Sequence, residues 1–379
     1  MAVTLCAVRP WWAASTKASP MSPRPLCAAF CSALLSLPVV AAASPAVAAG
    51  PAVAARPASP AATAAGPGLD RLAGPNRYAT AVEVSKGVWP DGSANGKHVY
   101  VASGENFPDA LAGGPAAASQ GEPLLLVPRA GMLPAVVANE LKRLNPSYIT
   151  IFGGTGAVSS AMASQLKPYS TAKTVYREAG EDRYQTAMYL ANYATTWVGR
   201  TPTYPDTVYV ANGETFADAL SGGAAAALEG APLLLTPRAR LSDWTEGALA
   251  QIQPSKIIVL GGTGAVSSTA FTQLRGYAPT VVRIGGSDRF DTAAKVSKAT
   301  FPTASDVSEV FLASGLNYPD ALAATPAVGV LGDVSLLLTR PTCVPGSTVT
   351  EVNRLQPDFI TAIGGTAAVS DAALDGRPC

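Results

Sequence analysis

The chain has 379 residues, of which 48% are hydrophobic and 14% charged, and its formal net charge is +1. A charge so close to zero does not support a basic protein that coats nucleic acid, so we expect no nucleic-acid partner. The only histidine is His98, which has no counterpart in the rest of the chain. We therefore expect no histidine-based triad, no two-histidine zinc site and no metalloprotease motif. We therefore expect no catalytic residue, no metal and no cofactor.

Residues 1–43 are typical of a secretory signal. A start with three basic residues and no acidic one precedes an apolar run over 26–40, and small residues follow. This run is too short and too interrupted by Ser and Pro to span a membrane. Met21 is a more usual start for such a signal than Met1. We expect a secreted protein with no membrane span after signal removal, in which 24 of the 27 basic residues face 26 acidic ones.

Residues 44–68 consist almost entirely of Ala, Pro, Val and Gly. Such a stretch cannot bury a hydrophobic core, so we expect a flexible tether.

The rest of the chain is one domain repeated three times. Two arginines recur together at steps of 106 residues, as Arg71 and Arg77, Arg177 and Arg183, and Arg283 and Arg289. This period exceeds that of a solenoid and matches the size of a small domain. We place unit 1 at 69–173, unit 2 at 174–279 and unit 3 at 280–379.

Short apolar runs alternate with amphipathic or alanine-rich runs in each unit. In unit 1 they predict, in chain order, a strand at 69–72, a helix at 78–88, a strand at 99–102, a helix at 109–119, a strand at 124–127, a helix at 134–144, a strand at 148–152 and a helix at 160–166. Strands that are apolar throughout are typical of a parallel sheet covered by helices. The predicted fold class is therefore α/β, with ligands expected at the carboxyl ends of the strands.

The six repeated arginines are candidate ligand-binding residues. The first of each pair ends a strand, and the second begins the next helix. Two guanidinium groups at one turn can bind carboxylate or phosphate groups. The alternative is that they join neighbouring units through aspartates, and both roles can hold at once.

A second repeated segment places an aspartate at the start of an alanine-rich helix in each unit, as Asp109, Asp218 and Asp320. A carboxylate there caps amides and complements the helix dipole. Alternatively, each aspartate pairs with an arginine across a unit boundary or contacts a ligand.

A glycine-rich segment over 153–159 recurs over 261–267 and, with one change, over 364–370. It follows a strand and opens a helix, where helix amides can hold an anion. It matches neither the dinucleotide fingerprint nor the phosphate loop. The favoured interpretation is a tight turn in which Gly153 and Gly154 supply permissive backbone angles and Ser159 caps the next helix.

Together these segments resemble the cell wall binding repeat type 2 family. The resemblance implies three Rossmann-like units around a pseudo-threefold axis, which hold surface proteins to the wall without a covalent bond. In clostridial relatives the partner is an anionic wall polymer, and a proline-leucine strand is implicated in binding it. Carried over, this implies binding by Pro123, Leu124, Leu125, Leu126, Pro232, Leu233, Leu234 and Leu235. Unit 3 has Ser335 in place of the proline.

Cys343 and Cys379 are the only cysteines that remain once the signal is removed. Two cysteines in an oxidising compartment are expected to pair, and the bridge would stabilise the chain end by roughly 3–4 kcal/mol. The alternative is two free thiols.

The sequence thus predicts a secreted, non-enzymatic protein of the cell wall or cell surface, a monomer with internal pseudo-threefold symmetry. Its expected partner is an anionic or carbohydrate wall polymer held between the units. One alternative is a cell-wall hydrolase of the amidase type, for which we find no metal or nucleophile set. Another is a small-ligand receptor that uses clefts at the strand ends.

Overall fold

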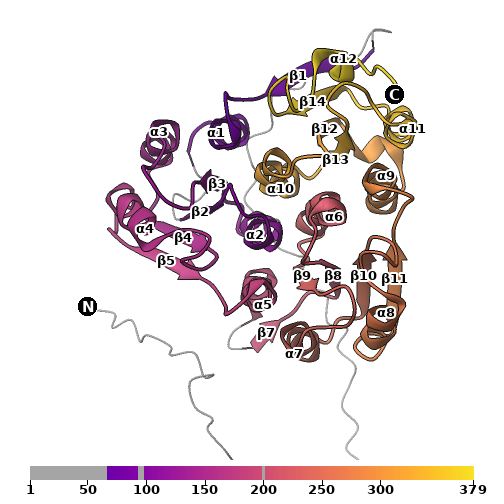
Figure 1. The fold of residues 1–379 in the computed structure, drawn as a ribbon, viewed down its shortest axis with the longest axis horizontal. Helices are drawn as coiled ribbons and strands as arrows, with labels where there is room; N and C mark the ends of the chain where they lie inside the picture. The colour runs from indigo at the N-terminus through magenta and orange to yellow at the C-terminus, as the bar shows by residue number, and fades with distance from the viewer. Residues whose placement is uncertain (1–65, 93–97, 199–200) are drawn as a thin grey trace, which may run out of the picture. The chain divides into compact units, whose positions relative to one another are not determined.

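The computed structural model describes residues 66–92, 98–198 and 201–379. They form three four-stranded parallel sheets with helices around them. The expected signal over 1–43, including Met21, and nearly all of the expected tether over 44–68 lie outside them. Figure 1 labels the helices and strands.

The elements of unit 1 follow the predicted order, with bounds that differ by at most one residue. They are β1 (Gly68–Leu72), α1 (Arg77–Val88), β2 (His98–Ser103), α2 (Pro108–Ser119), β3 (Leu124–Val127), α3 (Ala135–Leu144), β4 (Tyr148–Phe152), α4 (Ser160–Leu166) and the 3-10 turn η2 (Lys167–Tyr169). The apolar runs form strands because helices cover them, and β3 is buried along its whole length.

Units 2 and 3 repeat this order. Unit 2 contains β5 (Val175–Glu178), α5 (Arg183–Ala191), η3 (Asn192–Ala194), a hairpin of β6 (Thr196–Val198) and β7 (Thr201–Thr203), β8 (Thr207–Asn212), α6 (Ala217–Leu228), β9 (Leu233–Thr236), α7 (Asp243–Ile252), β10 (Lys256–Leu260) and α8 (Ser268–Leu274). Unit 3 contains β11 (Thr280–Ile284), α9 (Arg289–Thr300), η4 (Ala304–Asp306), β12 (Glu309–Ser314), α10 (Pro319–Leu331), β13 (Val334–Thr339), α11 (Gly346–Leu355), β14 (Phe359–Ile363) and α12 (Asp371–Leu374).

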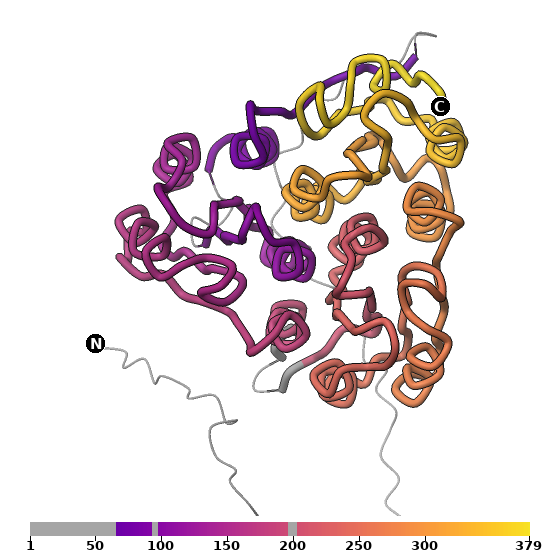
Figure 2. The backbone as a smooth tube through the Cα atoms, in the orientation of Figure 1, coloured from indigo at the N-terminus to yellow at the C-terminus, as the bar shows by residue number. Residues whose placement is uncertain are grey.

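The first strand of each unit belongs to the sheet of the unit before it. The strand orders are β3-β2-β4-β5, β9-β8-β10-β11 and β13-β12-β14-β1. In the third sheet, β1 lies parallel to β14, with Gly68 opposite Phe359 and Leu72 opposite Ile363. The start of unit 1 therefore closes the three units into a ring, and Figure 2 shows the indigo strand beside the yellow C-terminal segment.

The three alanine-rich helices α2, α6 and α10 pack against one another in the middle of the ring (Figure 1). Small residues let them approach closely. A Cβ added to Gly114 would lie 2.5 Å from Thr325 Cγ2, and one added to Gly329 would lie 2.7 Å from Ala118 Cβ. The buried side chains of all three units form one continuous core there.

A disulfide fixes the C-terminal end of unit 3. Cys343 and Cys379 are bonded, with their Cα atoms 4.9 Å apart, which confirms the predicted pairing. The backbone N–H of Val344 donates to the carbonyl of Arg377 at 2.7 Å. The last residues are thereby held against the loop that follows β13.

Candidate functional site: the junctions between units

The first arginine of each pair holds the glycine turn of the preceding unit. Arg177 donates to the carbonyls of Gly153 and Val158, at 2.5 and 2.8 Å. Arg283 and Arg71 make the equivalent bond to the first glycine of the turns in units 2 and 3, at 2.8 Å each. Burial lowers the pKa of Arg177. These three arginines thus hold neighbouring units together through backbone carbonyls, whereas the sequence suggested a junction through the aspartates.

The second arginine of each pair holds the loop after the central strand of its own unit. Arg289 donates to the carbonyl of Gly315 at 2.6 Å, and Arg77 and Arg183 make the same contact in units 1 and 2. The guanidinium of Arg289 also lies 5.6 Å from the centre of the Phe216 ring, which belongs to unit 2. A guanidinium carries five N–H donors, so these half-buried groups can bind a ligand as well.

The repeated aspartates bridge the units instead of capping their own helices. Helix α2 begins at Pro108 without a side-chain cap, and Asp109 lies in its first turn. Its carboxylate lies near Thr186 and Arg183 of unit 2, which oppose the rise in its pKa that burial causes. Thr186 in turn accepts from the backbone N–H of Gly180 at 3.0 Å. The expected capping of helix amides is therefore wrong for α2, because the carboxylate lies against the neighbouring unit.

The same arrangement recurs at the other two junctions. Asp218 lies near Thr292 and Arg289, and Asp320 lies near Thr80 and Arg77. Burial raises the pKa of all three carboxyls, and the threonine and arginine partners oppose that shift. The threonines recur at the same 106-residue step as the arginines. They could therefore have been predicted as junction residues from the repeat, but the sequence analysis did not single them out.

The glycine turn has the predicted geometry in part. Gly153 has a φ of +106°, and Ser159 accepts from the N–H of Met162 at 3.1 Å, as an N-cap does. Gly154 is not among the residues with positive φ. A Cβ added to Gly153 would overlap the carboxyl of Asp109, whereas one added to Gly154 would meet no atom within 4 Å. The first glycine thus makes room for the aspartate, and the second faces open space.

Each junction is named here by the units that it joins. Junction 1/2 comprises Asp109, the 153–159 turn and Arg183. Junction 2/3 comprises Asp218, the 261–267 turn and Arg289. Junction 3/1 comprises Asp320, the 364–370 turn and Arg77, and it exists because β1 closes the ring.

At junction 2/3 these groups line a cleft of about 360 Å³. One wall carries Asp218 and the open side of the glycine turn, and the other carries the start of α9 with Ser287, Asp288 and Arg289. The cleft therefore presents a cation, a hydroxyl and carboxylates on backbone turns at the carboxyl ends of the strands. This is the edge where the α/β fold predicts a ligand.

An aromatic cluster lies between the three junctions. The rings of Phe107, Phe216 and Tyr318, one from each unit, have centroids 5.3–5.7 Å apart. Tyr318 Oη donates to the carbonyl of Glu105 at 2.7 Å. These residues belong to the repeated aromatic-x-Asp segment, and their mutual contact places the pseudo-threefold axis between them.

The proline-leucine strands lie in the core. Pro123 and Pro232 are buried, and the leucines that follow them in β3 and β9 are at most 2% exposed. A side chain enclosed by helices cannot contact a polymer outside the protein unless the core opens. We therefore correct the expectation that Leu124, Leu125, Leu126, Leu233, Leu234 and Leu235 form the binding surface. Ser335 in unit 3 is buried as well and donates to Ser297 Oγ at 2.9 Å.

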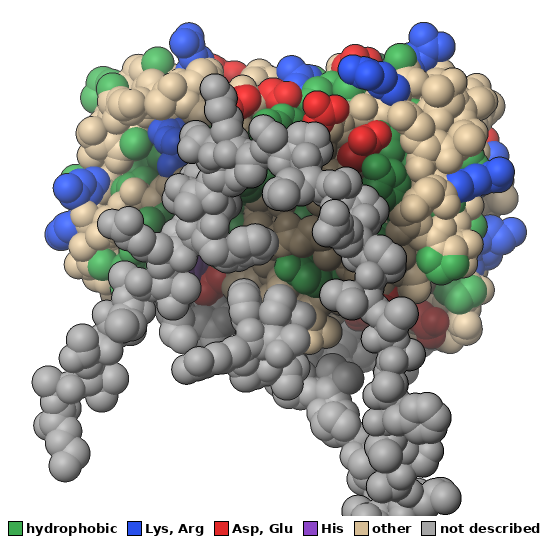
Figure 3. Space-filling view, turned by 90° about the horizontal axis from the view of Figure 1, so that it is seen from below, with side chains coloured by type: hydrophobic (Ala, Val, Ile, Leu, Met, Phe, Trp, Pro, Cys, Tyr) green, Lys and Arg blue, Asp and Glu red, His purple; other side chains and the backbone are tan. Residues whose placement is uncertain are grey.

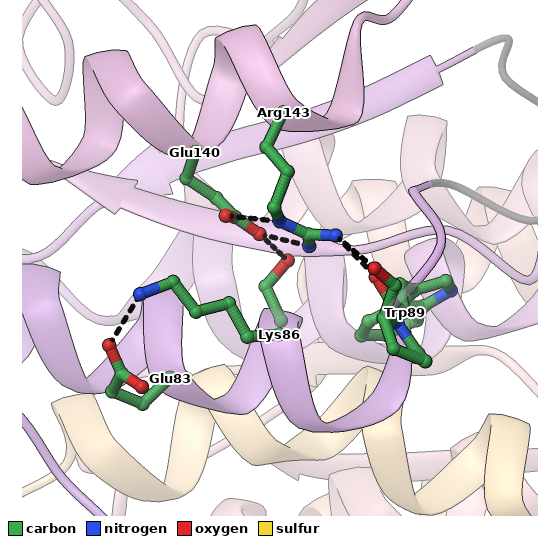
Figure 4. Close-up of polar contacts among 7 residues, drawn as sticks. Glu83, Lys86, Trp89, Glu140 and Arg143 are labelled. Atoms are coloured by element: carbon green, nitrogen blue, oxygen red, sulfur yellow. Dashed lines mark hydrogen bonds and ion pairs between the residues drawn. The ribbon is translucent and has the colours of Figure 1, made fainter.

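An ion pair with a buried glutamate supports the helices of units 1 and 3. Glu140 is fully buried and lies 2.6 Å from Arg143, which also donates to the carbonyl of Trp89 at 2.8 Å and so closes the end of α1 (Figure 4). Glu351 and Arg354 repeat the pair in unit 3. Unit 2 has Ala248 at the position of the glutamate, so this support is not required by the fold itself.

Charges of both signs are mixed on the surface. On the visible part of the face in Figure 3, Lys and Arg side chains lie apart, with Asp and Glu between them. Among the described residues, no group of three or more His, Cys, Asp or Glu side chains is placed to hold a metal ion. Within the same residues, no helix has the length and apolar character that crossing a membrane needs.

The sequence profile of cell wall binding domain 2 (CWB2) matches the chain three times, over residues 71–163, 177–271 and 283–374. The chain belongs to the CWB2 family. Each match begins at the first arginine of a pair and includes the aspartate, the buried strand and the glycine turn. The three units are therefore three tandem cell wall binding domains, and such domains indicate a location at the cell surface.

Two curated relatives and two solved structures share this region. The chain is 31% identical to the N-acetylmuramoyl-L-alanine amidase LytC of Bacillus subtilis (strain 168), over 80% of this chain and 56% of that protein. It is 27% identical to the amidase enhancer of the same organism, over 79% and 39%. The structures of Cwp6 and Cwp8 from Clostridium difficile superpose with TM-scores of 0.74 and 0.70 at 28% and 27% identity. They cover 82% and 80% of this chain, and about half of each of those chains is matched.

Proposed function

We propose that this protein is exported and attaches without a covalent bond to an anionic or carbohydrate polymer of the cell wall, which it holds at the junctions between its units. The observation that supports this most is the cleft at junction 2/3 in a chain of three cell wall binding domains. Arg289 suits a phosphate or carboxylate, while Ser287 and Asp288 suit the hydroxyl groups of a glycan. Three weak sites on one body give firm retention through effective concentration.

We also propose that the chain itself is not an enzyme. Its one histidine and the joining of Cys343 to Cys379 support this, because they leave few groups for nucleophilic or metal-assisted hydrolysis. The chain spans about half the length, or less, of its curated relatives, and the activities in their names belong to those whole proteins. Incubation with purified walls should release no new amino groups or reducing ends; their release would support a hydrolase.

Sedimentation with purified walls tests the binding. The protein should sediment with the walls, and it should stay in solution once teichoic-type anionic polymers have been extracted. Binding should also weaken as salt rises, because screening loosens contacts between arginines and an anionic polymer. Full binding to extracted walls would exclude an anionic polymer as the partner.

Replacing Arg77, Arg183 and Arg289 together by glutamine tests whether these arginines bind the polymer. Each site contributes separately, so the triple variant should release more protein than any single one. Circular dichroism must show that the variant is folded, since the arginines also hold loop carbonyls. A folded triple variant that still sediments fully would show that other residues bind the wall.

A further inference from the structure

The three junctions share their arginine, aspartate, threonine and first glycine, but their charges differ, first of all at the two positions before the helix-starting arginine. These are Pro75 and Asn76 at junction 3/1, Ser287 and Asp288 at junction 2/3, and Glu181 and Asp182 at junction 1/2. All six residues are exposed. The formal charge at this pair of positions therefore falls from zero to −1 to −2 around the ring.

This charge series is placed where a ligand would meet it. Ser287 and Asp288 line the cleft at junction 2/3 beside Arg289. The second position is the helix N-cap in all three units. Asn76 accepts from the N–H of Ala79 at 3.1 Å, and Asp182 and Asp288 make the matching bonds at 2.8 and 2.9 Å. The cap geometry is the same at each junction, so the difference that remains is charge.

Other charged groups lie near these positions. Glu105 lies beside Arg77 at junction 3/1, where Tyr78 Oη donates to it at 3.2 Å, and Glu214 lies near Arg183 at junction 1/2. Unit 3 has Leu316 at the equivalent position. At junction 2/3, Asp291 accepts from Lys295 at 3.0 Å. At junction 3/1, Glu83 pairs with Lys86 at 2.9 Å. The buried aspartate of the bridge is present at every junction and does not distinguish one from another. Junction 1/2 therefore has the most negative charge beside its arginine, from Glu181, Asp182 and Glu214.

We infer that an anionic segment of the wall polymer binds less well at junction 1/2 than at junctions 3/1 and 2/3. The inference rests on the proposed function, because it ranks sites for the polymer named there. A negative charge next to the binding arginine repels a phosphate or carboxylate and offsets the attraction of the guanidinium. Asn76 and Asp182 are thus specificity-determining positions, and the three repeats are not equivalent in binding.

Two substitutions change this charge while keeping the cap. Asparagine and aspartate cap helices equally well, so Asn76→Asp and Asp182→Asn should leave stability nearly unchanged. The probe is poly(glycerol phosphate) of defined length, titrated by calorimetry at low ionic strength, where the Debye length is about 30 Å. Asn76→Asp should weaken binding about two- to fivefold, and Asp182→Asn should strengthen it by a similar factor.

Two control variants make the same changes of net charge at the opposite, amino edge of the sheet in unit 3. Asp306→Asn lies just before β12, and Asn353→Asp lies near the end of α11 before β14. Both positions are exposed. Each control should shift affinity by less than half of the effect of its matched junction variant.

The outcomes separate the two proposals. If the wild-type protein binds neither the probe nor purified walls, the proposed function fails. If the wild-type protein binds, but each junction variant changes the affinity only as much as its matched control, the ranking of the junctions is overturned. The matched pairs are Asn76→Asp with Asn353→Asp, and Asp182→Asn with Asp306→Asn. A larger effect at both junction positions, in opposite directions, supports the ranking.

Discussion

Replacing Arg71 by alanine should open the ring at the point where the two ends of the described chain meet. Arg71 lies in β1, yet its guanidinium donates to the carbonyls of Gly364 and Val369 in unit 3, at 2.8 and 2.7 Å. It also pairs with Asp371 at 2.9 Å. These contacts connect residues that are about 300 positions apart in the sequence, so no local chain connection replaces them.

The expected loss follows from the exposure of these groups. The side chain of Asp371 is 78% exposed, so its ion pair contributes less than about 1 kcal/mol. Hydrogen bonds from a charged donor contribute about 1.5–3 kcal/mol each. The Arg71 side chain is 20% exposed, and water replaces part of the two carbonyl bonds. Arg71→Ala should therefore lower the free energy of unfolding by about 2–4 kcal/mol.

Urea denaturation measures this loss, and hydrogen exchange with mass spectrometry shows where it acts. The amides of β14 should exchange faster in Arg71→Ala, because β1 is free to leave the edge of the sheet. Arg177→Ala is the matched control, since its strand stays connected to the same sheet by a short stretch of chain. Unchanged protection of β14, with a loss below about 0.5 kcal/mol, would refute the role of Arg71 in ring closure.

Three further predictions concern the supports of the fold. Cys343→Ser opens a loop with a sequence separation of 36 and should lower the free energy of unfolding by about 3–4 kcal/mol, and a wild-type protein insensitive to reductant would contradict this. Glu140→Ala leaves Arg143 without its buried partner and should cost about 2–4 kcal/mol in thermal unfolding, whereas a cost below about 1 kcal/mol would show that the pair is dispensable. Burial raises the pKa of Asp109 above its ordinary 3.8, so its contribution to stability is complete below that pH and is lost as the pH rises through the folded pKa. Asp109→Asn should flatten this dependence in urea titrations from about pH 4 upward, and an unchanged slope would speak against it.

The sequence by itself determined the repeat, the elements and the disulfide. The helix and strand bounds of unit 1 follow from runs of neighbouring residues, whose apolar character and caps act locally. The pairing of Cys343 with Cys379 follows from the absence of other cysteines beyond residue 31. The family likewise follows from short segments that recur in a fixed order. Each of these conclusions depends on residues close in the chain or on a count of the cysteines, and none of them requires knowledge of spatial contacts.

The tertiary structure decided what each repeated residue contacts. Three units with the same pattern offer three equivalent sheets, so the sequence could not show that β1 joins β14 across the whole chain. It also could not show that Asp109 lies against Thr186 and Arg183 of the next unit. Burial and partners at such distances arise only when α2, α6 and α10 pack together, because that packing fixes which faces meet and which remain open to a ligand.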